Sequence, residues 1–293
     1  MNYWEVSLMD CQIKITDNKA VWKIQAALAL IFLLNPFLGV LSTLFFVFVS
    51  KEKSMAFYLV IILTLFMWCL QSTRSFHLGE PSDWAGNYYY NFHNAAITDT
   101  LTYLFFTTKE YAWQAFNLIG YYLFDGDFLS YANFIVALTY MFTFAAIYKF
   151  WNYIQADPRF LVASLCLFAF VTEVNGICNN LLRQQFAMSM MLYAIIERCT
   201  NGRILYPLLV ISFFTHTMTG FFIPFLFIRL GKKASFRFYI YIVLGFGLLY
   251  ILFTNLSIFS SSSFYAFQRL ATASNAYALK DIIPVSYTHL RAH

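Results

Sequence analysis

Long apolar runs separated by short polar stretches make up most of the chain. A bilayer core of about 30 Å needs roughly 20 apolar residues in helical form. Six runs approach this length, the last two on either side of a polar break at residues 175–180: Ile24–Val49, Met55–Thr73, Leu129–Lys149, Phe238–Thr254, Phe160–Ile177 and Leu181–Ile196. The pattern predicts an all-α, polytopic integral membrane protein with about seven or eight spanning or broken helices.

The lysines and arginines between these runs predict the orientation of the helices, because short cytoplasmic loops are enriched in both residues. Placing residues 51–53 in the cytoplasm also puts the basic stretches 149–159 and 198–203 inside. The same choice places loop 74–128, which holds six acidic residues, outside. The segments before residue 24 and after Thr254 are then also expected outside.

The run Ile204–Ile228 is interrupted by Pro207, Pro224 and a polar Thr-His-Thr stretch around His216. A single crossing would place the strongly basic residues 229–237 outside, against the positive-inside rule. We predict two short helices that enter and return, with His216 near the outer turn, as in broken helices that line a cavity. The alternative is that another predicted span is wrong.

The external loop 74–128 holds two apolar segments that are too short to cross the bilayer, Thr98–Thr108 and Tyr111–Phe124. Their amphipathic pattern favours interfacial or re-entrant helices. An Asp-Gly-Asp turn at residues 125–127 then precedes the next span.

Residues 1–284 are expected to form one multi-span membrane domain, because we find no long internal repeat and no domain boundary in them. Residues 285–293 resemble translated sequencing-adapter sequence. We therefore expect this tail to be non-native, and the natural chain to be truncated here and to continue differently after Pro284.

The composition excludes a soluble domain. Hydrophobic residues make up 60% of the chain and charged residues 11%, whereas soluble domains carry about 25% charged residues. The five cysteines are scattered without Cys-x-x-Cys spacing, which argues against a disulfide framework or a cysteine metal site. The net charge of +5 gives no reason to expect a nucleic-acid partner, because what matters here is where the basic residues lie.

Arg183 begins an otherwise apolar helix, and Gln184 follows it. A mid-membrane arginine costs about 2.5–3.5 kcal/mol on insertion scales, so such residues usually face a cavity or a partner. The alternative is that Arg183, which lies within one turn of the helix end, reaches the outer headgroups. Arg269 is expected on the same side, and two or three external arginines would suit a diphosphate.

His216 follows two phenylalanines in the predicted broken helix. An imidazole can act as a general base, or bind phosphate when it is protonated. The alternative is a histidine that only donates a hydrogen bond between packed helices.

The stretch 74–95 combines Arg74, Asp83 and Tyr88 with amides and further aromatic residues. This composition suits sugar recognition, in which sugar rings stack on aromatic faces and hydroxyls bond to acids. One alternative is an aromatic-rich interfacial loop. Another is a metal site, but the histidines and acids here match no known ligand spacing. We expect no metal and no cofactor.

Four features occur in order along the chain: Arg74 after an early span, Pro81-Ser82-Asp83 with Tyr88, Asn180-Leu-Leu-Arg183-Gln-Gln-Phe-Ala187, and Phe213-Phe-Thr-His216-Thr217. With them, residues 24–284 resemble the EpsG-like family of exopolysaccharide polymerases, which play the same role as the Wzy-type O-antigen polymerases. The chain departs from the family in having Pro-Ser-Asp where Gly-Thr-Asp is common, and in a longer N-terminal segment.

The resemblance implies a metal-independent glycosyltransferase in the bacterial plasma (inner) membrane. It would polymerise oligosaccharide repeat units, carried on polyprenyl diphosphate, into exopolysaccharide or O-antigen at the outer face of the bilayer. Chain-length regulator and flippase proteins would be its partners.

The resemblance also implies roles for the polar residues. Arg183 would stabilise the departing diphosphate, and His216 or Asp83 would activate the acceptor hydroxyl. Four further residues would bind substrate: Arg74, Tyr88, Gln184 and Arg269.

Two other functions fit parts of the pattern. A lipid-linked glycan flippase would also have broken helices and buried arginines, but we would expect internal repeats and charges near the midplane. A membrane acyltransferase that modifies the polysaccharide would place a histidine in an apolar setting, on a different helix pattern. A transport assay and acyl-group analysis of the polymer discriminate between these functions.

Overall fold

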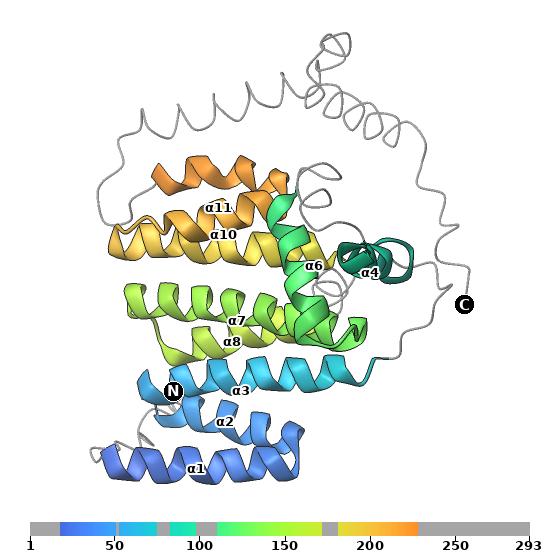
Figure 1. Cartoon of the computed structure of the whole chain (residues 1–293). Helices are drawn as coiled ribbons and strands as arrows, with labels where there is room; N and C mark the ends of the chain where they lie inside the picture. The colour runs from blue at the N-terminus through green and yellow to red at the C-terminus, as the bar shows by residue number, and fades with distance from the viewer. Residues whose placement is uncertain (1–17, 51–52, 75–82, 98–109, 172–180, 228–293) are drawn as a thin grey trace, which may run out of the picture. The chain divides into compact units, whose positions relative to one another are not determined.

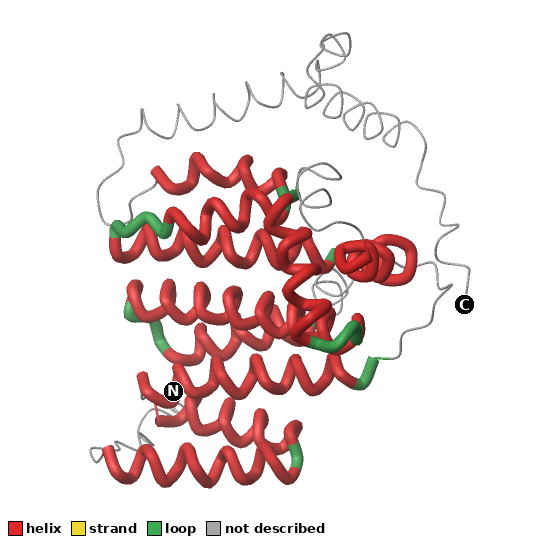
Figure 2. The backbone as a smooth tube through the Cα atoms, viewed as in Figure 1, coloured by secondary structure: helices red, strands yellow, loops and turns green. Residues whose placement is uncertain are grey.

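The computed structural model describes five segments of the chain: residues 18–50, 53–74, 83–97, 110–171 and 181–227 (Figure 1). The chain divides into two units, residues 1–230 and 231–293, and every described residue belongs to the first. Regular structure in the described segments is entirely helical (Figure 2), which confirms the all-α prediction for this part of the chain. The predicted span Phe238–Thr254 and Arg269 lie outside the described residues.

Two described helices, α3 (Lys53–Ser72) and α7 (Phe128–Ile154), are long and apolar enough to cross a membrane. They coincide with two of the predicted spans, although α7 extends five residues beyond the predicted end at Lys149. Helix α8 (Pro158–Phe170) begins close to the predicted residue 160. The predicted continuation of that span to Ile177 lies outside the described residues.

The prediction of one span over Ile24–Val49 is wrong, because this run forms two helices, α1 (Asn18–Leu34) and α2 (Pro36–Ser50). Pro36 starts α2, where its missing N–H costs nothing. The Asn35 side-chain oxygen accepts from two backbone N–H groups of the first turn of α2, both at 3.1 Å, so it caps this helix.

The two helices approach each other closely at Gly39, where a Cβ atom would lie 2.4 Å from Cα of Phe32. The chain therefore turns back at Asn35, and α2 runs beside α1 instead of extending it (Figure 1). The Tyr58 hydroxyl of α3 also donates to the Gln25 carbonyl of α1 at 2.9 Å. The start of α1 thus lies at the same end as the start of α3, which one continuous helix over Ile24–Val49 would not allow.

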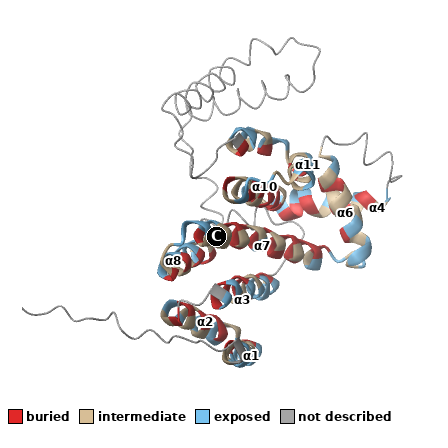
Figure 3. Cartoon of the chain, turned by 90° about the vertical axis from the view of Figure 1, so that its left-hand side faces the viewer, coloured by how far each residue is buried: buried red, intermediate tan, exposed pale blue. Residues whose placement is uncertain are grey.

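Helix α7 lies between α3 and α10 (Leu182–Asn201) and packs against both (Figure 1). Its buried face carries large aromatic side chains, including Tyr140 and Phe144, and Phe144 contacts Phe168 of α8 edge to face. Exposed apolar side chains cover much of the outer surface, with Leu34 88% and Trp22 73% exposed (Figure 3). Such a surface suits contact with lipid.

The predicted external segment contains η1 (Trp84–Tyr88), α4 (Tyr89–Ile97) and α6 (Tyr111–Leu123). Helix α6 confirms the predicted short helix at Tyr111–Phe124, and Thr98–Thr108 lies outside the described residues. The predicted turn is also present, with positive φ angles of 52° at Asp125 and 76° at Gly126.

Buried polar groups fix α6 against α7. The Tyr131 hydroxyl donates to the Asn117 side-chain oxygen at 2.9 Å, and the Asn117 amide donates to Gln114 at 3.2 Å. All three side chains are buried. Because buried polar groups are costly without partners, this chain of hydrogen bonds specifies one register of α6 on α7.

The predicted broken helix is confirmed as α11 (Tyr206–Thr215) and η2 (Thr217–Phe227), which meet at His216. Helix α11 runs along α10, where the Ser212 hydroxyl donates to the Ala187 carbonyl at 2.7 Å. Helix η2 then returns to the far end of α10, where Arg198 Nε donates to the Leu226 carbonyl at 3.1 Å. His216 is therefore brought to the start of α10, next to Arg183.

Candidate functional site

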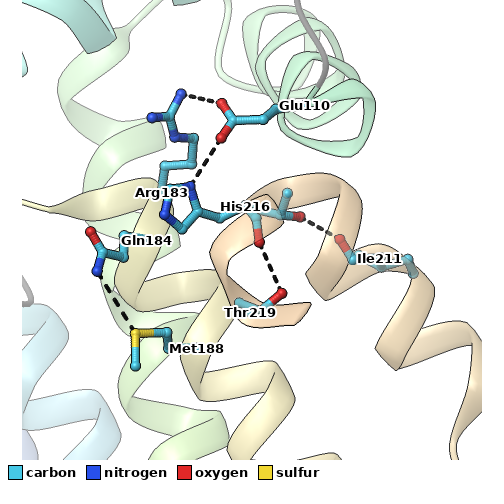
Figure 4. Close-up of polar contacts among 8 residues, drawn as sticks. Glu110, Arg183, Gln184, Met188, Ile211, His216 and Thr219 are labelled. Atoms are coloured by element: carbon cyan, nitrogen blue, oxygen red, sulfur yellow. Dashed lines mark hydrogen bonds and ion pairs between the residues drawn. The ribbon is translucent and has the colours of Figure 1, made fainter. Parts of the chain in front are cut away.

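The Glu110 carboxylate joins Arg183 and His216, two residues that the sequence singled out separately (Figure 4). One oxygen forms an ion pair with Arg183 Nη1. The other lies 2.9 Å from His216 Nδ1. We call these three residues the Glu110 triad. The structure thus brings together an anion, a permanent cation and an imidazole from distant parts of the chain.

Each member of the triad lies at an interruption of a helix. Glu110 directly precedes α6, and its side chain makes no cap hydrogen bond there but reaches Arg183 and His216. Arg183 lies in the first turn of α10, and His216 has extended backbone between α11 and η2.

Helix packing holds these three ends together. Tyr111 of α6 contacts the ring of Phe214 in α11 at 5.8 Å, and Phe116 contacts Phe186 of α10 at 5.3 Å. At the joint itself, the Thr219 hydroxyl donates to the His216 carbonyl at 2.9 Å (Figure 4). Since side-chain direction follows the backbone, these contacts set where the imidazole points.

The triad is mostly shielded from solvent, with side-chain exposures of 25% for Arg183, 16% for Glu110 and 14% for His216. Among the described residues, Arg183 Nε is buried without a hydrogen-bond partner. A buried charge is stable only with partners, and here the carboxylate supplies one for Arg183. The guanidinium therefore keeps capacity for a further acceptor, such as a phosphate oxygen.

Tyr88 lies next to this site. Burial raises the pKa of its phenol, and the charge of Arg183 together with a hydrogen bond from the Arg183 backbone partly opposes that shift. The ring contacts Trp113 edge to face at 5.8 Å. Tyr88 is therefore a buried, neutral hydroxyl that can donate to a bound substrate.

Arg74 and Asp83 lie close to η1. The Arg74 guanidinium lies 4.3 Å from the ring centre of Trp84, a cation–π contact. Asp83 is exposed at the start of η1, and its charge acts on Tyr88. Of the predicted residues, Arg183, His216 and Tyr88 form the centre, whereas Asp83 lies at the surface.

Gln184 follows Arg183 but does not join the triad. Its amide nitrogen lies 4.0 Å from the Met188 sulfur, along α10 and away from Glu110 (Figure 4). Gln184 is half-buried. Among the described residues, no group of three or more His, Cys, Asp and Glu side chains could hold a metal ion.

Sequence reasoning missed Glu110. The residue was one of six acids in loop 74–128, and no motif distinguishes it from the other five. Its one local signal is its position, because a charged residue directly before an apolar helix lies at the edge of the bilayer and near the helix N-terminus.

Comparisons with known proteins give the site a family context. No curated protein and no solved structure matches the chain. The sequence model of the EpsG family matches residues 57–281, which is more than half of the chain and includes Glu110, Arg183 and His216. The chain belongs to the EpsG family.

Proposed function

We propose that this chain is a membrane glycosyltransferase that polymerises polyprenyl-diphosphate-linked repeat units into exopolysaccharide or O-antigen. The EpsG family is associated with polysaccharide polymerisation. The observation that carries the proposal is the meeting of Arg183 and His216 on the Glu110 carboxylate. A diphosphate leaving group and an acceptor hydroxyl need a cation and a base close together, and this site supplies both.

The apolar helices and the charge distribution support a place for the site at the outer face of the bacterial plasma (inner) membrane. Helix α3 begins at Lys53 and ends two residues before Arg74, and Arg74 contacts Trp84 near Tyr88. If the basic residues 51–53 are cytoplasmic, this end of α3 and the neighbouring triad face outward. Lipid-linked substrates displayed on that face would reach the site from the bilayer.

Arg183 would bind the diphosphate of the donor. Its planar guanidinium matches two phosphate oxygens, and it stabilises the negative charge that develops as the diphosphate departs. The diphosphate oxygens would replace part of the pairing that Glu110 now supplies. A permanent cation in this place removes the need for a metal ion at the leaving group.

His216 would act as the base for the acceptor hydroxyl. With Nδ1–H donated to Glu110, the lone pair lies on Nε2, which takes the hydroxyl proton. The hydroxyl oxygen then forms a bond to the anomeric carbon of the donor, and the bond from that carbon to the diphosphate breaks. The electron pair leaves with the diphosphate, so atoms and charge balance. Tyr88 and Arg74 would position the glycan, and buried Trp84 would hold the Arg74 guanidinium in place.

The test is glycan chain length in cells that lack their native polymerase and carry the complete gene. The gene is supplied intact, as Arg183→Ala, or as Arg159→Ala, a matched control in which an exposed arginine of α8 is removed. We expect a ladder of repeats with the intact gene and the control, and single units with Arg183→Ala.

Two results would overturn the proposal. Single lipid-linked units on the outer face with every variant exclude polymerisation of that substrate. Units that stay inside until the intact gene is supplied indicate a flippase, a class that also uses broken helices.

A further inference from the structure

Five aromatic rings form a continuous strip across α4 and α6, outside the Glu110 triad. We call this set the aromatic strip, and in order it consists of Tyr90, Tyr89 and His93 on α4 and Tyr121 and Tyr122 on α6. Each ring centre lies between 4.2 and 5.8 Å from the next. Because α4 and α6 pack against each other (Figure 1), the strip runs from one helix onto the other.

The two ends of the aromatic strip are open to a ligand. Tyr90 is 55% exposed and Tyr122 is 70% exposed, whereas the three rings between them are half-buried. Fully buried Phe92 lies beneath the half-buried part and contacts Tyr121 at 5.4 Å. Tyrosines on such a fixed backbone offer a large contact area, and few of their rotatable bonds are lost on binding.

The surface around the strip carries no charge. Helices η1, α4 and α6 contain no Lys, Arg, Asp or Glu. Burial lowers the pKa of His93, so its imidazole is neutral at pH 7. The polar groups beside the rings are amides, with Asn94 exposed and Asn91 donating to Asn87. Rings with hydroxyl tips and amides suit the faces and hydroxyls of sugars, whereas a surface that recognises anionic lipid headgroups is rich in Lys and Arg.

The aromatic strip is continuous with the candidate site. Tyr88, on whose phenol the charge of Arg183 acts, directly precedes Tyr89 of the strip. The other end of the strip lies near the end of α6, and Glu110 lies directly before the start of this helix. At the rise of an α-helix, Tyr122 is roughly 18 Å from Glu110 along the axis. The strip therefore covers the distance of a glycan that extends away from the triad.

We propose that the aromatic strip binds an uncharged stretch of the substrate glycan, several sugars away from the bond that is formed. The rings stack on the sugar faces, and the tyrosine hydroxyls and nearby amides bond to the sugar hydroxyls. The inference rests on the proposed polymerase function and adds a second subsite to it. A glycan of several repeats reaches both the triad and the exposed rings, so it binds more tightly than a single repeat.

The test measures binding without transfer. Oligosaccharides of one and of three repeats are released from the polymer of the cells used for the chain-length test, taken before their native polymerase is removed. Saturation-transfer NMR then gives the Kd of each for the complete protein in phosphatidylcholine nanodiscs. We expect three repeats to bind about tenfold more tightly than one, as two additional aromatic contacts allow. Tyr90→Ala and Tyr122→Ala should each reduce this preference about threefold, and the double variant should abolish it.

A matched control and the outcomes separate a glycan subsite from a lipid-facing surface. Phe160→Ala removes a 68% exposed ring of α8 and should leave the preference unchanged. All three rings are exposed, so the variants should fold. Equal binding of one and three repeats by the parent, or a preference that survives in the double variant, would overturn the proposal and make the tyrosines anchors in the headgroup region. Failure of the polymerase function differs from both: the ladder is missing from the chain-length test, while the preference for three repeats remains.

Discussion

Helix α10 carries a charged cluster at each end, and the two clusters use similar groups in different ways. At the far end, buried Glu197 forms an ion pair with Lys149 of α7 and accepts from Asn201 at 3.0 Å. The neighbouring Arg198 donates to backbone carbonyls of Leu226 and Gly202. These side chains close helix ends and tie η2 to α10, which is a structural task.

At the near end, the Glu110 triad joins side chain to side chain. Neither the carboxylate of Glu110 nor the guanidinium of Arg183 caps a helix, and Arg183 Nε has no hydrogen-bond partner among the described residues. The comparison teaches that a buried ion pair is not a sign of function by itself. What distinguishes the near end is an arginine whose Nε lacks an acceptor among the described residues, whereas Arg198 at the far end donates to two backbone carbonyls.

The largest expected difference in transfer rate is between variants of the two arginines of α10, Arg183 and Arg198. Arg183→Ala should lower the rate of repeat-unit transfer about 10²–10³-fold, since a lost charge stabiliser costs that much in other enzymes. Arg198→Ala should weaken the η2 contact but leave the rate per folded protein unchanged. The measurement is transfer in proteoliposomes, normalised to protein that elutes as a folded species. Equal losses in both variants would contradict the distinction.

The next effect concerns the base. His216→Gln should slow transfer about 10²-fold or more, because general base catalysis typically contributes 10²–10⁴. Asp83→Asn should have a much smaller effect, because Asp83 is exposed and lies outside the triad. If Asp83→Asn is the more damaging change, the base is Asp83, and His216 has the packing role that the sequence also allowed.

Glu110→Gln tests the positioning role. Glutamine keeps the size of the side chain, but its amide can donate to Nδ1, which favours the wrong tautomer of His216. We expect a roughly tenfold or greater fall in kcat with KM nearly unchanged, because the donor still meets Arg183. A rise in KM alone would show that Glu110 shapes the binding site and does not orient the base.

Tyr88→Phe should have a smaller effect, a rise in KM of about fivefold, the size expected for one lost hydrogen bond. Burial raises the pKa of Tyr88, so its hydroxyl stays protonated at neutral and mildly alkaline pH. KM of the parent protein should therefore not rise between pH 7 and pH 9 through ionisation of Tyr88. A pH-dependent rise that disappears in Tyr88→Phe would contradict this.

The two long apolar helices α3 and α7 and the helix break at His216 could be predicted from sequence because local composition decides them. Apolar runs of the right length gave α3 and α7, and prolines with a polar stretch gave α11 and η2. The α1–α2 turn was missed because Asn35 and Pro36 stand alone within a long apolar run. A proline is tolerated in the first turn of a helix, so Pro36 does not by itself mark a break between two helices. The Asn35 side chain, which caps α2, is what marks the start of the second helix.

The candidate site could be predicted only in part. Arg183 and His216 were found because a charged or polar residue in an apolar setting is unusual on its own, and Tyr88 was found because its stretch combines acids, amides and aromatic residues. Glu110 was missed because its role depends on three segments meeting in space. The partners of this carboxylate, Arg183 and His216, are far from Glu110 in the sequence. The residues next to Glu110 show only a charged residue before a helix.

The smallest expected change in activity comes from the far end of α10. Glu197→Gln removes the ion pair with Lys149 but leaves an amide that can still accept from Asn201. Lys149 is a quarter exposed and can turn toward water, so the loss should be about 1 kcal/mol of stability. Thermal unfolding in detergent measures this loss, while transfer per folded protein should match the parent. A transfer defect as large as that of Glu110→Gln would mean that both clusters serve the reaction and that unused bonding capacity does not distinguish the site.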